Sequence, residues 1–498
     1  PTFIYGHISL SPCTTATYVF YGGMLKPHAS VFCPPPTQPA DWARHEFAGA
    51  QLPDQRLNER LCMIATAFAQ QPTASIPQAC GPGPAIQGAY RFFENEAIDS
   101  EAIRDAHHQT TLERVRLAPI VLALQDTSIL NYTTHPQTAG LGPIGTRRQK
   151  IIGLLLHSTL AVTPSGQPLG MLHTAVRARD PKAVGSAQHR HAKSTAEKES
   201  QKWLDSLSAC QQLAPQCPNT LLVNVADREG DLYDLFAQAL APTAEASVHL
   251  LVRSKHNRKL AGEDRRLWEA LARRRSAGQL QVRVGRRGEQ PARLATLSIR
   301  FAPVTLQAPP RKAGQPLLKL WAIEARELRP PKGGSPIVWR LLTTLPVTSV
   351  AEACLRVSWY AQRWQIEVIH KVLKSGCKIE QRQLETAARL ERVLAVDQVV
   401  AWRLLALCKA AREQPDEAIS AWLSQAEWEA LWCYVHQRTT PPKTPPSVRQ
   451  AVRWIAQLGG FMARKGDGEP GPITLWRGLH RLNDLTAMWR LCHSKKQK

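Results

Sequence analysis

Apolar residues recur every three or four positions near both ends of the chain, which is the spacing of amphipathic helices. The pattern predicts a small helical domain over 41–115, and further helices over 347–388 and through most of 389–498. Residues 1–40 show neither helical nor strand spacing and are rich in Pro, Thr and Ser. We expect them to be a disordered extension, in which Met24 is a candidate for the natural start.

The middle of the chain has the pattern of strands. Short apolar runs at 120–124, 151–162 and 221–226 are bounded by polar or turn residues, which predicts buried strands. Alternation of apolar and polar residues over 247–346 predicts a β-rich insertion. The order of these patterns favours an α/β core over 116–246, which the insertion separates from the helices that follow.

The charge of the chain predicts a polyanionic partner. It has 63 Lys and Arg against 40 Asp and Glu, a formal net charge of +23 and a pI near 9.9. Double-stranded DNA is favoured, although an anionic membrane surface or a ribosomal environment would also account for the excess. No run of about 18 apolar residues is available to span a bilayer, so no membrane is expected. The eleven cysteines form no C-x-x-C pair, which favours a reducing cytoplasm.

Two aspartates follow predicted strands: Asp126 comes after the first apolar run and Asp227 after the last. Carboxylates at the C-terminal ends of adjacent strands lie where open α/β sheets place their active sites. Taken singly, Asp126 is equally explained as a cap of the turn at Thr127 and Ser128. Asp227 is equally explained as an ion-pair partner of Arg228.

The predicted helix around Glu367 carries a polar stripe. At about 100° per residue, an arc of roughly 60° holds Tyr360, Arg363, Glu367 and Lys374. A solvated helix with an Arg363–Glu367 ion pair is the alternative interpretation. If Glu367 converges with the two aspartates, the three carboxylates supply the hard oxygen ligands that Mg²⁺ or Mn²⁺ prefers. Two such ions per active site are suited to phosphoryl transfer.

The segment from 253 to 300 holds fourteen Lys and Arg against four acidic residues. This composition favours contact with DNA phosphates, although a solvated basic face has the same composition. His173, His189 and His191 lack a Cys or carboxylate at ligand spacing, so we expect no metal role for them. No glycine-rich loop is followed by the Lys-Ser or Lys-Thr of a phosphate-binding loop, so no nucleotide is expected.

The sequence resembles the bacterial insertion-sequence DDE transposases of the cut-and-paste, hairpin-forming class over about residues 40–480. The most specific resemblance is a Y-x2-R-x3-E-x6-K signature, formed by Tyr360, Arg363, Glu367 and Lys374. Shorter matching motifs are Ala89-Tyr90-Arg91-Phe92, Gln125-Asp126-Thr127, Glu197-Lys198-Glu199-Ser200 with Trp203, Asp227-Arg228-Glu229, Val252-Arg253-Ser254-Lys255-His256, Pro331-Lys332-Gly333, Leu458-Gly459-Gly460-Phe461 and Leu475-Trp476-Arg477-Gly478.

The resemblance implies a ribonuclease H-like catalytic core, a fold shared with retroviral integrases. It implies that three carboxylates are catalytic and hold the metal ions, namely Asp126, Asp227 and Glu367. It further implies that DNA phosphates near the cut are held by Tyr360, Arg363 and Lys374.

Four residues of the insertion are also expected to contact DNA through the same resemblance. Trp339 would stack on a base flipped out of the hairpinned end, although by itself this residue would be interpreted as core. Arg253, Lys255 and His256 match a family motif in the basic segment.

The implied function is that of a DNA transposase. The helical domain at 41–115 would bind the terminal inverted repeats, and 389–498 would mediate dimerisation, so that a homodimer forms the synaptic complex with element ends and target DNA. Excision would proceed by metal-dependent strand cleavage and hairpin formation, in the bacterial cytoplasm and associated with the nucleoid. Two alternatives remain open: a catalytically inactive DNA-binding derivative, and a structure-specific metal-dependent nuclease.

Overall fold

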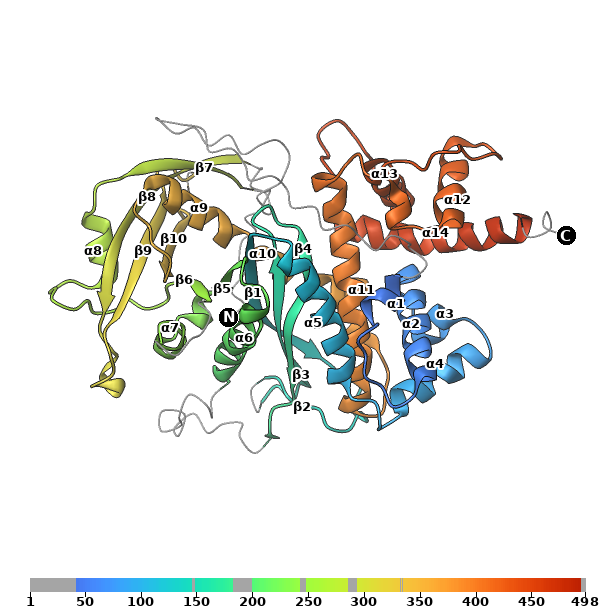
Figure 1. The fold of residues 1–498 in the computed structure, drawn as a ribbon, viewed down its shortest axis with the longest axis horizontal. Coiled ribbons are helices and arrows are strands. Elements are labelled where there is room, and N and C mark those ends of the chain that lie inside the picture. Colours follow the sequence, from blue (N-terminus) through green and yellow to red (C-terminus); the bar gives the residue numbers. More distant parts are fainter. Residues whose placement is uncertain are drawn as a thin grey trace.

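The computed structural model describes residues 42–145, 148–181, 199–241, 248–284, 293–331, 333 and 335–493. Within this part of the chain, a mixed β-sheet is flanked on one side by two groups of helices (Figure 1). The extension expected at 1–40 lies outside the described residues.

Ten strands form the sheet: β1 (Ile120–Asn131), β2 (Gly142–Pro143), β3 (Ile152–Val162), β4 (Pro168–Arg177), β5 (Leu221–Ala226), β6 (His249–Arg253), β7 (Gly278–Val284), β8 (Arg293–Leu306), β9 (Leu318–Glu327) and β10 (Val338–Thr343). Their order is β2-β3-β1-β5-β6-β10-β9-β8-β7, and β4 pairs with the outer part of β3. β5 pairs in parallel with both β1 and β6, whereas the other pairs are antiparallel.

The segment 247–346, predicted to be a β-rich insertion, continues this sheet. β6 pairs with β5 on one side and with β10 on the other, and β9, β8 and β7 follow outward. Fully buried residues of β8, such as Leu297 and Ile299, belong to the same hydrophobic core as Leu122 and Leu124 of β1. The outer strands and the strands that carry the two aspartates are therefore one hydrogen-bonded unit.

Five helices precede the sheet: α1 (Trp42–Glu46), α2 (Gln55–Gln70), α3 (Ile76–Cys80), α4 (Pro84–Glu94) and α5 (Ser100–Arg116). Three of them begin at capping residues, since Asp54 accepts from an N–H of α2, Ser75 forms a capping box and Asp99 accepts from an N–H of α5. The apolar positions predicted to face inward do so, and Phe68 and Phe93 stack at 6.3 Å.

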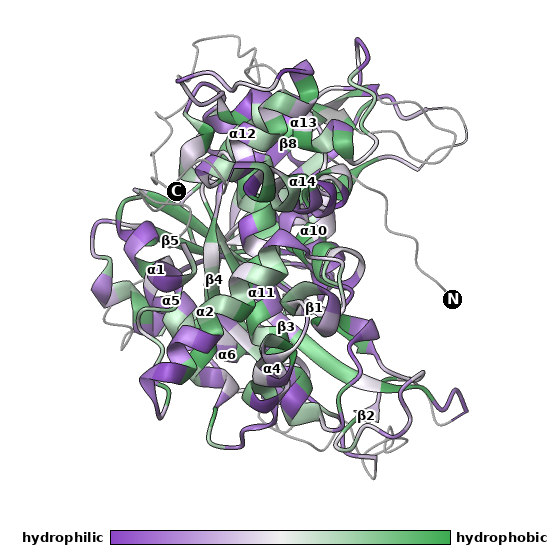
Figure 2. Cartoon of the chain, turned by 90° about the vertical axis from the view of Figure 1, so that its right-hand side faces the viewer, coloured by the Kyte–Doolittle hydropathy of each residue, from purple (hydrophilic) through white to green (hydrophobic). Residues whose placement is uncertain are grey.

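The helix α11 (Ala387–Glu413) joins the two groups of helices. It contacts α2, α4 and α5 of the first group, and α13 (Val448–Leu458) and α14 (Pro472–His493) of the second, which also contains α12 (Gln425–His436). Figure 2 shows the hydrophobic α11 between the two groups. Its Arg392 donates to the carbonyl oxygens of Phe93 and Ile98, at 2.9 Å and 2.6 Å, and so fixes the end of α4.

The helix predicted around Glu367, within 347–388, is not continuous, which is a correction to the sequence analysis. It consists of α9 (Val350–Ala361), α10 (Trp364–Lys371) and a π-helical turn over Val372–Gly376. At the break, Arg363 N–H donates to Tyr360 O and Ile366 N–H donates to Arg363 O, so the backbone is locally tighter than an α-helix. A constant 100° per residue therefore does not hold from Tyr360 to Lys374, and the predicted single stripe is wrong.

Three helices cover the strands: α6 (Gln201–Leu213), α7 (Tyr233–Ala239) and α8 (Leu267–Arg273). The predicted α/β fold with helical ends is thus confirmed by the mixed sheet and the helices on either side of it in the sequence. Among the described helices, none combines the length and apolarity that crossing a membrane requires.

Candidate active site

Asp126 and Asp227 lie side by side on neighbouring parallel strands. The register pairs Leu124 of β1 with Val225 of β5, so the two aspartates, each two residues further along, occupy the same position across the sheet. Residues at matched positions of paired strands project to the same face. The two carboxylates consequently share one side of the sheet, and the charge of Asp227 acts on Asp126.

The two aspartates differ in how their strands continue. β1 extends past Asp126 because its second half pairs with β3, so the prediction that this strand ends at Asp126 is wrong. Asp227 does directly follow β5. Asp126 accepts the N–H of Thr127 at 2.8 Å, and Asp227 accepts the N–H of Glu229 at 2.7 Å, which caps a short 3₁₀ turn. Asp227 therefore acts as a cap here, and the alternative of an ion pair with Arg228 is not seen.

Arg363 joins Glu367 to this pair of aspartates. Its Nη1 lies 3.3 Å from Oδ2 of Asp126, and its Nη2 donates to Oε1 of Glu367 one turn along α10. The side chains of Arg363, Asp126 and Glu367 are 15%, 20% and 28% exposed, so this contact lies in a partly buried recess. Three carboxylates from β1, β5 and α10 thus gather around one guanidinium group.

The gathering of acidic groups perturbs Asp126. Burial raises the pKa of Asp126 to about 7, and the charges of Asp227 and Glu367 add to the rise, whereas Arg363 and the N–H of Thr127 oppose it. Burial by itself would lower the pKa of Arg363, but nearby acidic groups, among them the carboxylates of Asp126 and Glu367, outweigh it and raise that pKa. A cation is therefore held where negative charge is concentrated.

The donor set has the chemistry that a divalent cation requires, since carboxylate oxygens are the preferred ligands of Mg²⁺ and Mn²⁺. Within the described residues, however, no group of three or more His, Cys, Asp or Glu is already arranged to hold a metal ion. The guanidinium of Arg363 lies between Asp126 and Glu367 instead. Metal binding by this set would require Glu367 to exchange its bond to Arg363 for the ion.

Tyr360 does not lie on a solvent-facing stripe. It is buried near Arg253 at the end of β6, and burial raises the pKa of this phenol while the charges of Arg363 and Arg253 lower it. The ring of Trp339 packs edge-to-face against it at 5.3 Å. Trp339 is only 7% exposed and belongs to the core, so stacking on a flipped base would require this region to open.

Lys374 lies at the far end of β1 from Asp126. Its Nζ is 3.7 Å from Glu380, whose carboxylate accepts the backbone N–H of Asn131, the last residue of the strand. Of the predicted polar stripe, the structure thus brings Arg363 and Glu367 to the aspartates, places Tyr360 beside Arg253, and leaves Lys374 at the end of the strand.

Asp231, four residues after Asp227, anchors the loop that contains Lys255 and His256. The fully buried carboxylate of Asp231 accepts the N–H groups of Lys255 and His256 at 2.7 Å and 2.9 Å, and it forms a 2.6 Å ion pair with Arg258. Sequence reasoning did not identify Asp231. The only feature of the sequence that could have indicated Asp231 is its position four residues after Asp227, in a chain with few acidic residues.

A buried polar network lies behind Asp126. The hydroxyl of Thr127 is 2.9 Å from Nδ1 of His157, and Nε2 of that ring is 3.1 Å from Oε1 of Gln125. The Gln125 amide in turn donates to Asn224 of β5. Burial lowers the pKa of His157 well below its usual value, so the imidazole is neutral and accepts at one nitrogen while donating at the other. The network links β1, β3 and β5 beside the carboxylates, and sequence reasoning missed it.

Two segments of the chain match models of transposase domains. Residues 39–98 match the transposase DNA-binding model, and residues 399–496 match the model of the transposase Tn5 dimerisation domain. Among solved structures, a cryo-EM structure of a piggyBac transposase synaptic complex with hairpin DNA aligns with 92% of this chain and 78% of that chain, at 8% identity and a TM-score of 0.36. That likeness carries no argument about fold or function.

The two matched segments lie on either side of the sheet in the sequence. The DNA-binding match covers α1 to α4, and the dimerisation match covers most of α11 together with α12, α13 and α14. The matches support the predictions of DNA binding near the beginning of the chain and of dimerisation near its end.

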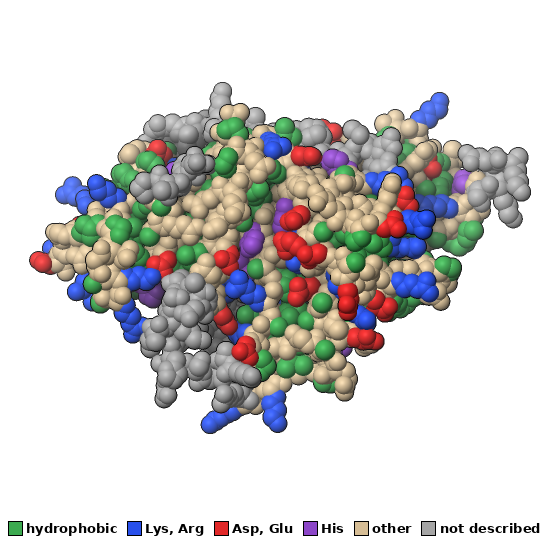
Figure 3. All heavy atoms as spheres, turned by 60° about the horizontal axis from the view of Figure 1, so that its bottom comes forward, with side chains coloured by type: hydrophobic (Ala, Val, Ile, Leu, Met, Phe, Trp, Pro, Cys, Tyr) green, Lys and Arg blue, Asp and Glu red, His purple; other side chains and the backbone are tan. Residues whose placement is uncertain are grey.

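Some basic residues of the insertion are already paired. Glu324, which is fully buried, accepts from Arg300 at 3.0 Å and from Arg340 at 2.8 Å, and Arg293 pairs with Glu327. Figure 3 shows a face with acidic side chains gathered near its middle and Lys and Arg mostly toward its edges. The basic excess is therefore unevenly distributed. His189 and His191 lie outside the described residues.

The network behind Asp126 should make a measurable contribution to stability. Gln125→Leu leaves the buried polar groups of His157 and Asn224 without their shared partner, each of which costs about 1–3 kcal/mol. We expect the free energy of unfolding in urea to fall by roughly 2–4 kcal/mol. Gln212→Leu, at an exposed position of α6, is the matched control and should change it by less than about 0.5 kcal/mol. Equal stabilities of both variants would contradict the network's role.

Proposed function

We propose that this chain is a metal-dependent DDE transposase with Asp126, Asp227 and Glu367 as its catalytic and metal-binding residues. The observation that carries the proposal is the placement of two aspartates at matched positions of parallel strands, with Glu367 linked to Asp126 through Arg363. The strand order also supports a ribonuclease H-like core, because antiparallel β4, β3 and β1 are followed by parallel β5 and β6.

The chemistry would be phosphoryl transfer on DNA at the element ends. Two bound Mg²⁺ or Mn²⁺ ions would activate the attacking oxygen and stabilise the leaving oxygen. Asp126, Asp227 and Glu367 would hold the ions, and Arg363 would then be free to bind a phosphate oxygen. Water attack on the phosphodiester would release a 3′ hydroxyl, and attack of this hydroxyl on the opposite strand would form the hairpin. A second water would reopen the hairpin before strand transfer to target DNA.

The remaining predicted residues have roles consistent with their positions around this site. Arg253 lies against Tyr360, so both would act together near the cut. Lys255 and His256 follow β6 in the loop held by Asp231, and they would contact the DNA backbone. Lys374 at the end of β1 and Trp339 in the core would reach DNA only after local rearrangement. Two copies, joined through the dimerisation domains, would form the synaptic complex with both element ends.

The proposal is tested with DNA that carries the element's own terminal repeats. Purified protein with Mg²⁺ or Mn²⁺ should cleave this DNA and join the cut strand to a target, and EDTA should prevent both reactions. Asp227→Asn should bind the same DNA with unchanged affinity without cutting it. Equal cleavage by both proteins would overturn the proposal. Cleavage without any joined product would identify a nuclease instead.

The affinity of the proposed metal site for Mg²⁺ should depend on pH, and it can be measured without DNA cleavage. The pKa of Asp126 is raised to about 7, so below this pH a proton competes with the ion for the carboxylate. We expect the Mg²⁺ affinity measured by calorimetry to fall as pH decreases from 8 to 6, by about tenfold per unit below the pKa. Asp126→Asn should bind the ion more weakly, with little pH dependence over this range. A wild-type affinity that is identical at both pH values would contradict this assignment.

A further inference from the structure

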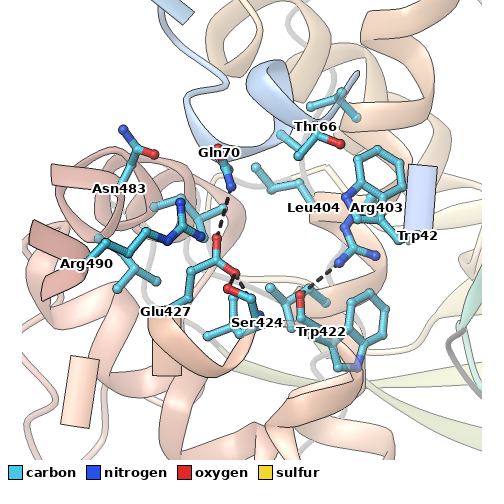
Figure 4. A pocket seen from close by; sticks show the side chains of 16 residues that line it. Trp42, Thr66, Gln70, Arg403, Leu404, Trp422, Ser424, Glu427, Asn483 and Arg490 are labelled. Atoms are coloured by element: carbon cyan, nitrogen blue, oxygen red, sulfur yellow. Dashed lines mark hydrogen bonds between the residues drawn. The ribbon is translucent and has the colours of Figure 1, made fainter. Parts of the chain in front are cut away.

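A cavity lies between the two transposase domains, away from the carboxylates. Its volume is about 380 Å³, and its walls come from α1 and α2 of the first group of helices, from α11, and from α12 and α14 of the second (Figure 4). Pockets that bind small organic molecules span roughly 300–1,000 Å³ and have mostly apolar walls with a few polar groups. Apolar residues make up more than half of this lining, including Leu404, Leu407, Leu423 and Leu482.

Two arginines line the cavity, and Arg403 is the one that lies on α11. Arg403 of α11 lies between two tryptophans, with its guanidinium carbon 4.6 Å from the ring centre of Trp42 and 5.4 Å from that of Trp422 (Figure 4). Its Nη2 donates to the carbonyl oxygen of Trp422 at 2.8 Å. It forms no ion pair with any acidic residue in the part of the chain that the structure describes.

Arg403 remains a cation at neutral pH. Burial lowers its pKa to about 10, which is still three units above neutrality. The charges of Glu427 and Glu46 favour the charged form from beyond ion-pair distance, and the two aromatic faces also favour it, but together they do not offset the cost of burial. An anion that entered the cavity would therefore meet a partly buried guanidinium with unused hydrogen-bond donors.

Glu427, the acidic residue in the lining, already accepts hydrogen bonds from other groups. One oxygen of Glu427 accepts both the N–H and the hydroxyl of Ser424 at 2.7 Å, as part of the cap of α12. The other accepts the amide of Gln70 of α2 at 3.4 Å. Arg490 adds a second positive charge from α14. The cavity thus has a net positive lining, with its carboxylate committed to the backbone and to Gln70.

We propose that this cavity is a binding site for a small organic anion, with a carboxylate or phosphate group on Arg403 and an apolar body against the leucines and tryptophans. Such a ligand would touch α1 and α2, which lie in the DNA-binding match, and α12 and α14, which lie in the dimerisation match. Its binding would therefore stabilise the contact between the two domains. The proposal does not depend on the carboxylate chemistry of the active site.

The test uses 2-naphthoate as the anionic probe and 2-naphthalenemethanol as its neutral counterpart, with the full chain in calorimetry. We expect saturable binding of naphthoate with a Kd below about 1 mM, and at least about tenfold weaker binding of the neutral compound. Arg403→Met should lose at least about tenfold in naphthoate affinity. Arg389→Met is the matched control, because Arg389 lies on the same helix but pairs with Glu385 outside the cavity. It should bind naphthoate as the wild type does.

A second variant separates loss of the site from loss of folding. Leu482→Trp keeps Arg403 but fills the cavity, and it should also abolish naphthoate binding while its circular dichroism spectrum stays unchanged. The proposal is overturned if naphthoate does not bind saturably, or if Arg403→Met binds it as tightly as the wild type. Sedimentation would show which samples are dimeric. The proposal is also overturned if the dimer does not bind the probe at all, because a second copy would then occupy the cavity.

Discussion

Replacing Arg363 by methionine is expected to shift the pH profile of DNA cleavage toward higher pH and to slow cleavage at pH 7 by about ten- to a hundredfold. Burial raises the pKa of Asp126, and the charge of Arg363 is the strongest influence that lowers it. Without the guanidinium, Asp126 would keep its proton to a higher pH, by about one to three units. The proposed reaction requires this carboxylate in its ionised form, so the rate should rise only at higher pH.

The measurement is the rate of cleavage of element-end DNA between pH 6 and 9 at one Mg²⁺ concentration below saturation, where a proton and the ion still compete for Asp126. Arg363→Lys serves as the control, because it retains a positive charge but cannot bridge Asp126 and Glu367 with two separate nitrogens. We expect it to show a smaller shift than Arg363→Met. An unchanged profile in the methionine variant would mean that Arg363 does not set the charge state of Asp126.

Replacing Arg382 by methionine should destabilise the protein by about 3–5 kcal/mol, because it leaves a buried aspartate without its partner. Arg382 forms two bonds to Asp397 of α11, at 3.2 Å and 3.1 Å, and both side chains are almost fully buried. It also donates to the carbonyl oxygen of Ala74 at 2.9 Å and packs over the ring of Phe68. This single side chain thus connects α11 to the DNA-binding domain.

Urea denaturation checks this prediction, and two further variants separate its causes. Arg389→Met, also associated with α11, removes a pair with the exposed Glu385 and should cost less than about 1 kcal/mol. The double variant Arg382→Met with Asp397→Leu should recover much of the loss, because neither buried charge remains. If the double variant is as unstable as the single one, the destabilisation arises from lost packing and not from the unpaired aspartate.

The elements of the fold were predictable where apolar residues follow one clear period. The strands β3 and β5 and the helices α2 and α4 fall where the apolar runs predicted them. The length of β1 was not predictable, because its second half is held by pairing with β3 and carries polar residues such as Asp126, Thr127 and Ser128. The break between α9 and α10 was missed for a similar reason, since no proline or glycine marks it.

Within the candidate site, the three carboxylates were identified from the sequence because strand ends and a specific signature mark them. Their supporting groups were not, since His157, Gln125 and Asp231 act through contacts between residues far apart in the chain. The burial of Trp339 likewise depends on a partner, Tyr360, from another element. Sequence patterns describe each element singly, whereas these roles arise only when the elements are packed together.

The link from Arg363 to Asp126 spans 237 residues of chain, and the link from Arg392 to Ile98 spans 294. During translation, the helices of the DNA-binding domain and the strands with both aspartates leave the ribosome long before α10 and α11. A nascent chain that ends before α10 therefore has neither a complete set of carboxylates nor the helix that supports its DNA-binding domain. The capacity to bind and cut DNA should accordingly arise late in synthesis, when nearly the whole polypeptide has been made.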